Sequence, residues 1–338
     1  MTNVLVHRDG KYVKDDSLSL LHLPAKERVW VQLTNPNEIE VKRVIDELNI
    51  PEDFVRSALD DEEGPRLDLD DDTGYRLIVF DIPVTQGKDE DSDAPYTTMP
   101  LAIIQKGNLT VSVCLNDSSK FNDIKHGTLR SNVLLDSPKI LYQFLLSFHS
   151  LYEIYLRAID KSTTNIERKL LHNSKTDAIL VEFMRLKNAL IYFASSLRQN
   201  ILVVDKLLAQ QGQRTNSTED DIETLENIQV EIKQAFATCN LQRELMSETM
   251  DTYSNIVNNR LAESMRFLTI VTIILAIPTL IAGVYGMNVK LPLAEMSGFW
   301  AFIIICAVIV VACLLVLFWL VPDRKAHRPK RPKRRKHK

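Results

Sequence analysis

Two long uncharged apolar runs near the end of the chain are the clearest feature of its hydrophobic pattern. Residues 267–284 form one run of 18 and residues 299–321 another of 23. As helices they would be about 27 Å and about 34 Å long, close to the thickness of a bilayer's hydrocarbon core, which is about 30 Å. Helices buried in a soluble core rarely lack charge over such a length. The pattern therefore predicts two membrane-spanning helices.

Apolar residues recur at spacings of three and four through the middle of the chain, which is the period of a helix. The pattern breaks near Asn173-Ser174 and ends at Gln211-Gly212. It predicts two long helices that pack together with coiled-coil-like contacts. The two seams consist of Leu141, Leu145, Phe148, Tyr152, Tyr155 and Ile159, and of Phe183, Leu186, Leu190, Phe193, Leu197, Ile201, Val204 and Leu208.

Residues 218–277 contain neither Gly nor Pro. The hydroxyl and acidic residues at 217–221 are typical of a helix N-terminus. We therefore expect one helix of more than 60 residues that begins here and continues into the first span. Such a helix is far longer than is usual in globular proteins, so it needs partner helices along its side. A continuous rod of this kind would couple cytosolic events to the membrane segment.

The N-terminal part of the chain shows shorter apolar runs. They predict strands at residues 28–33, 75–80, 100–105 and 109–114. Gly107-Asn108 separates the last two strands and favours a hairpin. A helix is expected after the first strand, with Asn35 as its N-cap, Pro36 as its first residue and Glu38 closing a capping box.

These patterns predict an α+β cytosolic domain followed by long stalk helices and a two-helix transmembrane hairpin. The expected parts are a cytosolic α/β domain at 1–136, an antiparallel two-helix stalk hairpin at 137–216, a stalk helix continuing into the first transmembrane helix at 217–285, an outer loop at 286–298, a second transmembrane helix at 299–321 and a basic cytosolic tail at 322–338.

The net charge of −3 conceals an uneven distribution. Residues 322–338 carry ten Lys or Arg and one acidic residue, whereas residues 1–266 hold 30 basic and 42 acidic residues. A basic cluster also fits nucleic-acid binding or a nuclear signal. Directly after a membrane span, we interpret it as a positive-inside determinant and expect no nucleic-acid partner.

The N-terminus carries no visible secretory signal, because His7-Arg8-Asp9 follows a very short apolar run. We therefore expect a multi-pass protein of the cell membrane, inner or plasma, with both termini in the cytosol. Only about a dozen residues, around 286–298, would face outward.

The sequence does not show the motifs of several other functional classes. The four cysteines form no CxxC pair, so neither a disulfide framework nor a zinc site is expected. No Gly-rich nucleotide loop or nucleophile–base constellation stands out, which disfavours an ATP-driven pump, an enzyme and an organic cofactor. Acidic runs at 60–63 and 68–72 lack the EF-hand order. They fit either a solvated surface or weak regulatory cation binding.

One face of the first span is small or polar, on a helix otherwise rich in Ile, Leu and Phe. Two interpretations fit: close helix packing with hydroxyls bonded to their own helix, or the lining of a pore. Pro278 frees a carbonyl one turn back, a defect tolerated where neighbours or water satisfy it, and this favours the pore. The stripe consists of Asn258, Ala262, Met265, Thr269, Thr272, Ala276, Thr279 and Gly283.

Two spans per chain cannot enclose a pore, so pore lining implies that several copies assemble around a symmetry axis. The stripe carries no carboxylate inside the span. Weak neutral dipoles suit an ion that crosses with much of its water shell, and Mg²⁺ dehydrates reluctantly.

The tetrad Tyr285-Gly286-Met287-Asn288 stands where the first span ends. With this tetrad, the hairpin and the long helix, the chain resembles the CorA family of divalent metal-ion transporters, whose naming motif is Gly-Met-Asn. The N-terminal domain is also similar, through Trp30-Val31-Gln32-Leu33 and Pro36, then Ile50-Pro51, then Leu59-Asp60 with Pro65-Arg66. The resemblance covers nearly the whole chain, but only the membrane motif is specific.

The resemblance implies a homopentameric funnel in which the long helix lines the pore and the second span faces lipid. The implied selectivity filter is Gly286, Met287 and Asn288, and Asn288 would offer carboxamide oxygens to a hydrated cation. The implied pore lining is Thr279, Ala276, Thr272 and Gly283. The implied hydrophobic gate, one that can dewet, is Met265 and Leu268. Asp251 would form an acidic ring at the cytosolic mouth, so Asn288 and Asp251 are the expected metal contacts.

The sequence also departs from the family pattern. Ala276 replaces a bulkier pore residue, which would widen the path. Lys290 in the outer loop would weaken cation attraction, and Glu295 would compensate. Asn227 stands where an acidic residue helps to sense intracellular Mg²⁺, so feedback inhibition is less secure than permeation.

The leading hypothesis is passive Mg²⁺ uptake through a pentameric pore, driven by the membrane potential, with Mg²⁺ also a possible regulator. An alternative within transport is Zn²⁺, Co²⁺ or Ni²⁺, although neutral oxygen ligands suit Mg²⁺ better. A membrane-anchored sensor or scaffold is the alternative from another class.

Overall fold

The computed structural model describes residues 2–8, 11–15, 20, 23, 27–86, 93–126, 140–172, 177–212, 219–287 and 298–320. The chain divides into two units, Met1–Met250 and Asp251–Lys338. Helix α6 (Glu219–Tyr285) is one continuous helix of 67 residues and contributes to both units.

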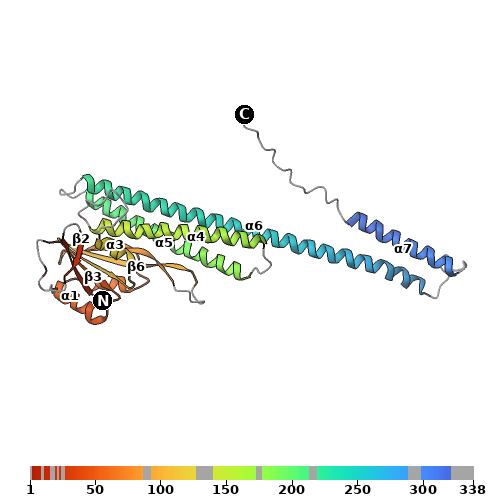
Figure 1. Cartoon of the computed structure of the whole chain (residues 1–338), viewed down its shortest axis with the longest axis horizontal. Coiled ribbons are helices and arrows are strands. Elements are labelled where there is room, and N and C mark those ends of the chain that lie inside the picture. Colours follow the sequence, from red (N-terminus) through yellow and green to blue (C-terminus); the bar gives the residue numbers. More distant parts are fainter. Residues whose placement is uncertain are drawn as a thin grey trace, which may run out of the picture. The chain divides into compact units, whose positions relative to one another are not determined.

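A mixed seven-stranded sheet forms the centre of the first unit (Figure 1). Its order is β2-β1-β3-β7-β6-β5-β4. Only β3 and β7 pair in parallel; the other neighbours are antiparallel. The strands are β1 (Thr2–Arg8), β2 (Lys11–Lys14), β3 (Val29–Thr34), β4 (Arg66–Leu69), β5 (Arg76–Thr85), β6 (Tyr96–Lys106) and β7 (Leu109–Cys114).

The four predicted strands are present as β3, β5, β6 and β7, and β5 and β6 are longer than predicted. The predicted hairpin is confirmed: Lys106 pairs with Leu109 across a two-residue turn. Gly107 has φ 58° there, a conformation that favours glycine. Strands β1, β2 and β4 were not predicted.

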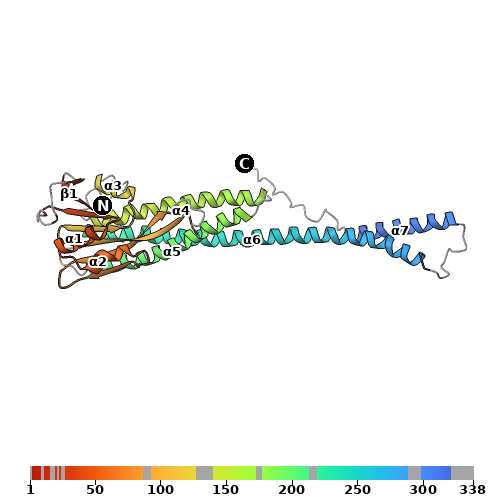
Figure 2. The same cartoon turned by 90° about the horizontal axis from the view of Figure 1, so that it is seen from below.

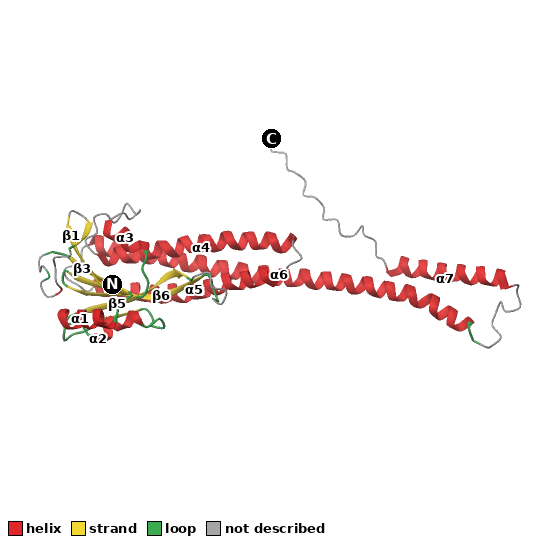
Figure 3. Ribbon diagram, turned by 60° about the horizontal axis from the view of Figure 1, so that its bottom comes forward, coloured by secondary structure: helices red, strands yellow, loops and turns green. Residues whose placement is uncertain are grey.

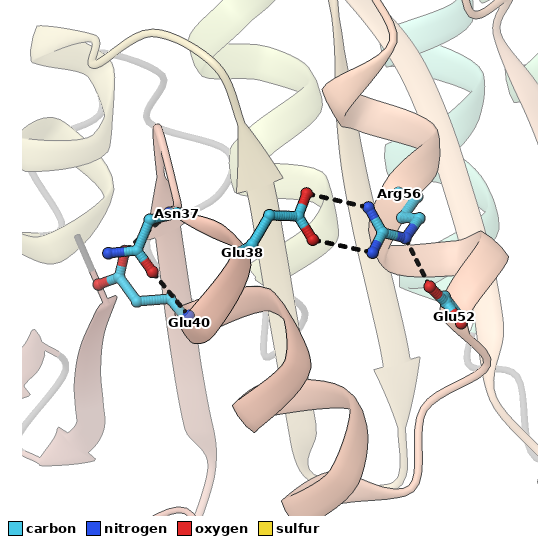
Figure 4. Close-up of polar contacts among 5 residues, drawn as sticks. All are labelled: Asn37, Glu38, Glu40, Glu52 and Arg56. Carbon is cyan, nitrogen blue, oxygen red and sulfur yellow. Dashed lines mark hydrogen bonds and ion pairs between the residues drawn. The ribbon is translucent and has the colours of Figure 1, made fainter.

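The predicted start of the first helix was wrong by two residues. Helix α1 (Glu38–Leu48) is capped by Asn37, whose Oδ1 accepts from the Glu40 N–H at 2.8 Å, and Glu40 Oε2 accepts from the Asn37 N–H at 3.1 Å (Figure 4). Asn35 instead has φ 43°, and its N–H donates to the Cys114 carbonyl at 2.9 Å. Because Asn35 still extends the β3–β7 pairing, the helix cannot begin there.

Glu38, predicted as part of the cap, joins two helices instead. Its carboxylate accepts two hydrogen bonds from the Arg56 guanidinium, at 3.1 and 2.9 Å, and Arg56 Nε donates to Glu52 at 2.6 Å (Figure 4). Glu52 and Arg56 belong to α2 (Glu52–Arg56), which continues as the 3₁₀ helix η2 (Ser57–Leu59). The bidentate geometry fixes α1 against α2.

Helices cover both faces of the sheet (Figure 3). On one face, Val41 and Val44 of α1 and Val55 of α2 join a buried cluster with Val31 and Val79 of the sheet. On the other face lie α3 (Ser119–His126), α4 (Ile140–His172) and α5 (Asp177–Gly212). Alternate residues of each strand point to opposite faces, so the strands are buried on both sides.

Aromatic side chains dominate the second face. Trp30 of β3 is fully buried, its indole N–H donates to Ser112 at 2.8 Å, and its ring meets Phe144 edge to face at 5.3 Å. Phe121 and Phe148 meet in the same way at 5.3 Å. The arrangement locks α3 and α4 onto the sheet.

The predicted long helices are confirmed, and α4, α5 and the first part of α6 run alongside one another (Figures 1 and 2). Most predicted seam residues are buried, for example Phe148, Phe193 and Leu197; Tyr155, Ile201 and Leu208 are half-buried. Helix α5 ends at Gly212 as predicted. The break predicted at Asn173-Ser174 lies outside the described residues.

The second unit contains the C-terminal part of α6 and helix α7 (Gly298–Leu320). Both are long and apolar enough to cross a membrane, and no residue in their most apolar windows is buried within the described chain. Such unburied apolar surface does not suit a soluble core helix, and the predicted two-helix hairpin is consistent with it.

Candidate functional site

The predicted stripe forms one exposed face of α6. Its members succeed one another at three or four residues, so their side chains lie above one another along the helix. An open groove of the second unit is lined by the stripe residues Thr272, Ala276, Thr279 and Gly283 and by the apolar residues Ile273, Leu275, Ile277, Leu280, Val284 and Met287. The exposed residues predicted to line and gate the pore are Met265, Leu268, Thr272, Ala276, Thr279 and Gly283.

The opposite face of this segment carries branched aliphatic residues. Ile270, Ile274, Ile277 and Ile281 are half-buried, and α7 reaches this face at Ile274. The stripe residues are exposed within the described chain.

The hydroxyls of the stripe are bonded to their own helix. Thr269, Thr272 and Thr279 each donate to the carbonyl four residues earlier, at 2.8, 2.9 and 2.9 Å. Each hydroxyl oxygen keeps acceptor capacity on its outer side. The face is therefore neutral and weakly polar.

Pro278 interrupts the hydrogen-bond ladder of α6. Because proline has no N–H, the carbonyl of Ile274 loses its helical partner. The Cys313 thiol of α7 lies 3.9 Å from that carbonyl oxygen, within reach of a weak S–H donor. The sequence indicated the free carbonyl but not its partner; a weakly polar residue in the second span was the available signal.

Helix α6 is continued by hydrogen bonds into the predicted filter. Gly286 N–H donates to Ala282 at 3.0 Å and Met287 N–H to Val284 at 3.2 Å. A methyl group on Gly286 would meet its nearest neighbour at 3.4 Å, and one on Gly283 would meet no described atom within 4 Å. The chain's own packing therefore requires neither glycine. Asn288, Lys290 and Glu295 lie outside the described residues.

Two polar residues of α6 were singled out from the sequence as candidate positions for cation contact or sensing. Asp251 and Asn227 are both exposed. Among the residues that the structure describes, no three His, Cys, Asp or Glu side chains come together as a metal site.

The two acidic runs have local roles. Asp60 accepts from the Glu62 N–H at 3.0 Å, and Asp70 from the Thr73 N–H at 2.9 Å. Arg66 forms ion pairs with Glu63 and Asp68. These contacts shape turns and fit the surface interpretation of both runs.

A buried polar cluster that the sequence did not reveal lies between β5 and the helices α4 and α5. Tyr152 O–H donates to the Asp81 carbonyl at 3.1 Å, and burial raises its pKa well above the ordinary value. Burial also raises the pKa of the Asp81 carboxyl, although Ser196 acts against this. Burial lowers the pKa of His149, and Glu153, 4.0 Å away, acts against it. The cluster belongs to the first unit and holds the sheet to its helices.

Comparisons with known proteins agree along nearly the whole chain. The profile of the family described as "CorA-like Mg²⁺ transporter protein" matches residues 25–331. The cobalt/magnesium transport protein CorA of Methanocaldococcus jannaschii is 28% identical over 322 residues, 92% of this chain and 96% of that protein. A shorter match, 35% identical over 78 residues, relates 23% of this chain to 22% of the cobalt/magnesium transport protein CorA of Thermotoga maritima.

Solved structures share the fold. The complete structure of the CorA magnesium transporter from Methanocaldococcus jannaschii matches with a TM-score of 0.75 at 24% identity, covering 94% of this chain and 96% of that one. The full-length CmaX protein matches with a TM-score of 0.68 at 16% identity over the same shares of the two chains. Both likenesses therefore cover nearly the whole chain.

Proposed function

The chain belongs to the family of CorA-like Mg²⁺ transporter proteins, and on that premise we propose that it forms a homopentameric channel for hydrated divalent cations, most of all Mg²⁺. Passage is passive and driven inward by the membrane potential. The role is transport of the ion, not catalysis.

The observation that carries the proposal is the exposed neutral face of α6. Thr272, Ala276 and Thr279 line an open groove, and all three side chains are exposed. Several copies of this face, turned towards a common axis, enclose a path without a charged side chain. The five-fold number comes from the family resemblance.

The glycines support close approach between copies. The described chain places nothing within 4 Å of a methyl group on Gly283, so the space beside this backbone is free for a neighbouring copy or for ions. Gly286, Met287 and Asn288 form the selectivity filter, in which carboxamide oxygens of Asn288 hold the ion's water shell. Met265 and Leu268, both exposed apolar residues of α6, form a gate that closes by dewetting.

Hydrated Mg²⁺ fits this path best. Mg²⁺ keeps its waters, and the threonine hydroxyls offer neutral oxygen acceptors to those waters. The two named relatives are cobalt/magnesium transport proteins, so Co²⁺ is the second candidate. Zn²⁺ and Ni²⁺ prefer imidazole or thiolate ligands, and the stripe contains no His or Cys.

A membrane location follows from the family and from the two candidate spans. We propose further that both termini are cytosolic, with the tail at 322–338 held inside by its positive charge. Asp251 forms an acidic ring at the cytosolic mouth, where it concentrates cations. Lys290 opposes cation entry at the outer mouth and Glu295 offsets it.

Substitution of the filter tests the proposal. Mg²⁺ influx is measured in liposomes that contain the purified full-length protein and an enclosed Mg²⁺-sensitive dye. We expect Asn288→Ala to lower influx by at least about tenfold, equivalent to about 1.4 kcal/mol of barrier. Asn240→Ala, on the part of α6 within the first unit, is the matched control and should leave influx unchanged.

Two other outcomes of this experiment would contradict the proposal. Equal influx through Asn288→Ala and the parent would refute the proposed filter. No influx through the parent protein would favour a membrane-anchored sensor or scaffold. Competition of Co²⁺, Ni²⁺ and Zn²⁺ against Mg²⁺ in the same liposomes ranks the ions.

A further inference from the structure

A cavity of about 440 Å³ lies in the first unit, at the end of the sheet that carries the β6–β7 turn. The ends of α4, α5 and α6 close it through Leu141, Leu207 and Leu225. Its volume falls in the range of about 300–1,000 Å³ that is usual for small-molecule sites. None of its lining residues belongs to the proposed ion path.

Three cationic side chains from three segments line this cavity: Arg28, Arg76 and Lys106. Arg76 is oriented by Gln105, whose Oε1 accepts from the guanidinium at 2.7 Å, and the Lys106 ammonium lies 4.8 Å from the centre of the Tyr75 ring. The Arg28 side chain is exposed, and its charge acts on Tyr12, another residue that lines the cavity.

The described lining contains no carboxylate. Acids lie near it in the sequence: Asp221 one turn before the lining residue Leu225, and Asp70, Asp71 and Asp72 between the lining residues Leu69 and Gly74. The lining itself carries three cationic side chains and no acidic one, so the wall of the cavity is positive. The contrast is large, because residues 1–266 hold 42 acidic and 30 basic residues. A positive cavity in an acidic domain attracts an anion, not the cations of the ion path.

The remaining walls suit an organic group. Tyr12 and Tyr142 supply aromatic rings, and the leucines of the helix ends supply apolar surface. Carboxamides of Gln105 and Gln211 also line the cavity. Arginine forks match phosphate geometry and lysine binds phosphate as a point charge.

We propose that this cavity binds a phosphorylated organic anion with at least two negative charges, its phosphates on Arg28, Arg76 and Lys106 and its organic part between the tyrosines and leucines. The site is independent of the proposed ion path, so failure of either proposal leaves the other standing.

Calorimetric titration of the full-length protein in detergent tests the site. ATP, pyrophosphate and adenosine are the probes, and the buffer is freed of divalent metal over a chelating resin, because dissolved chelators are themselves anions. We expect ATP and pyrophosphate to bind and adenosine to bind far more weakly. Arg28→Gln and Lys106→Gln alter exposed side chains, and each should raise the dissociation constant for ATP by about tenfold or more.

Two further variants sharpen the result. Arg28→Lys keeps the charge and should retain most of the affinity. Arg43→Gln removes an exposed arginine of α1 that pairs with Glu47 outside the cavity, and it should bind ATP as the parent does. Absence of ATP and pyrophosphate binding overturns the proposal, as does binding that Arg28→Gln and Lys106→Gln leave unchanged. Adenosine binding as tight as that of ATP also overturns it.

Discussion

The carboxamide of Asn200 pairs with both backbone polar groups of Asp81. Asn200 Oδ1 accepts from the Asp81 N–H and Asn200 Nδ2 donates to the Asp81 carbonyl, each at 2.9 Å. Asp81 lies on β5 beyond the end of its pairing with β4, which stops at Val79. A side chain of α5 thus takes the place of a neighbouring strand for one residue.

Removing this side chain should destabilise the first unit. Asn200→Ala leaves the buried Asp81 N–H without its partner, whereas the Asp81 carbonyl keeps the hydrogen bond from Tyr152. An unsatisfied buried N–H costs about 1–3 kcal/mol. We expect the thermal midpoint of the full-length protein, followed by circular dichroism, to fall by about 5–10 °C. Asn188→Ala is the control on the same helix, because Asn188 makes one exposed hydrogen bond of 3.3 Å to Asp93. A fall of equal size in both variants would contradict a special role for Asn200.

His149 should make stability depend on pH. It is buried, and neither ring nitrogen has a hydrogen-bond partner in the described structure. Burial lowers its pKa below 6.5, so the unfolded chain takes up the proton more readily than the folded one. The contribution of neutral His149 to the free energy of unfolding is therefore fully present above the pKa of the unfolded chain. It decreases as the pH falls through about 6.5 towards the lower pKa of the folded protein.

The measurement compares thermal midpoints between about pH 7.5 and about pH 5.5. His149→Gln should show a smaller decrease than the parent, while His126→Gln, an exposed histidine of α3, should behave like the parent. Asp81 and Glu231, whose pKa values are raised by burial, remain in all three proteins and cancel in the comparison. Parallel pH curves for parent and His149→Gln would refute the assignment.

The apolar constriction should limit flux. Leu268→Gly removes a large exposed apolar side chain from the proposed gate, which leaves a wider and wetter path. We expect a higher basal Mg²⁺ influx in liposomes. Ile270→Gly places the same substitution on the half-buried face, so it reproduces the loss of helix propensity, about 1 kcal/mol, without touching the stripe. A fall or no change in Leu268→Gly argues against a hydrophobic gate.

Cys313 should matter only while Pro278 is present. In the parent, Cys313→Ala removes the donor nearest the Ile274 carbonyl, at a cost of about 0.6 kcal/mol. In a Pro278→Ala background the restored Ala N–H satisfies that carbonyl, and Cys313→Ala should become neutral. A double-mutant cycle on detergent stability measures the coupling. A coupling energy of zero would show that the thiol and the carbonyl do not interact.

Local patterns predicted much of the fold because they depend on residues close in sequence. The β6–β7 hairpin followed from Gly107-Asn108, and the long helices followed from their apolar seams. The parallel β3–β7 pairing joins residues about 80 apart, such as Val31 and Val111, and no local pattern encodes it. The cap at Asn37 was missed because Asn35 offers the same chemistry and only the sheet decides between them.

In the candidate site, too, local sequence predicted some features, whereas others depend on packing between distant segments. Periodicity predicted that Thr272, Ala276 and Thr279 share a face, and they do. Which face α7 covers depends on packing between segments, as does the approach of Cys313 to Ile274. The role of Asn288 rests on its motif and stays a prediction.

Gly283 distinguishes the packing requirements of a single chain from those of an oligomer. The described chain leaves room beside its Cα for a methyl group, and alanine is the better helix former by about 1 kcal/mol. A single polypeptide therefore loses nothing when Gly283 becomes alanine. Any loss of stability caused by that substitution would arise only in the assembled oligomer. The substitution therefore tests the assembly of copies separately from the folding of one chain.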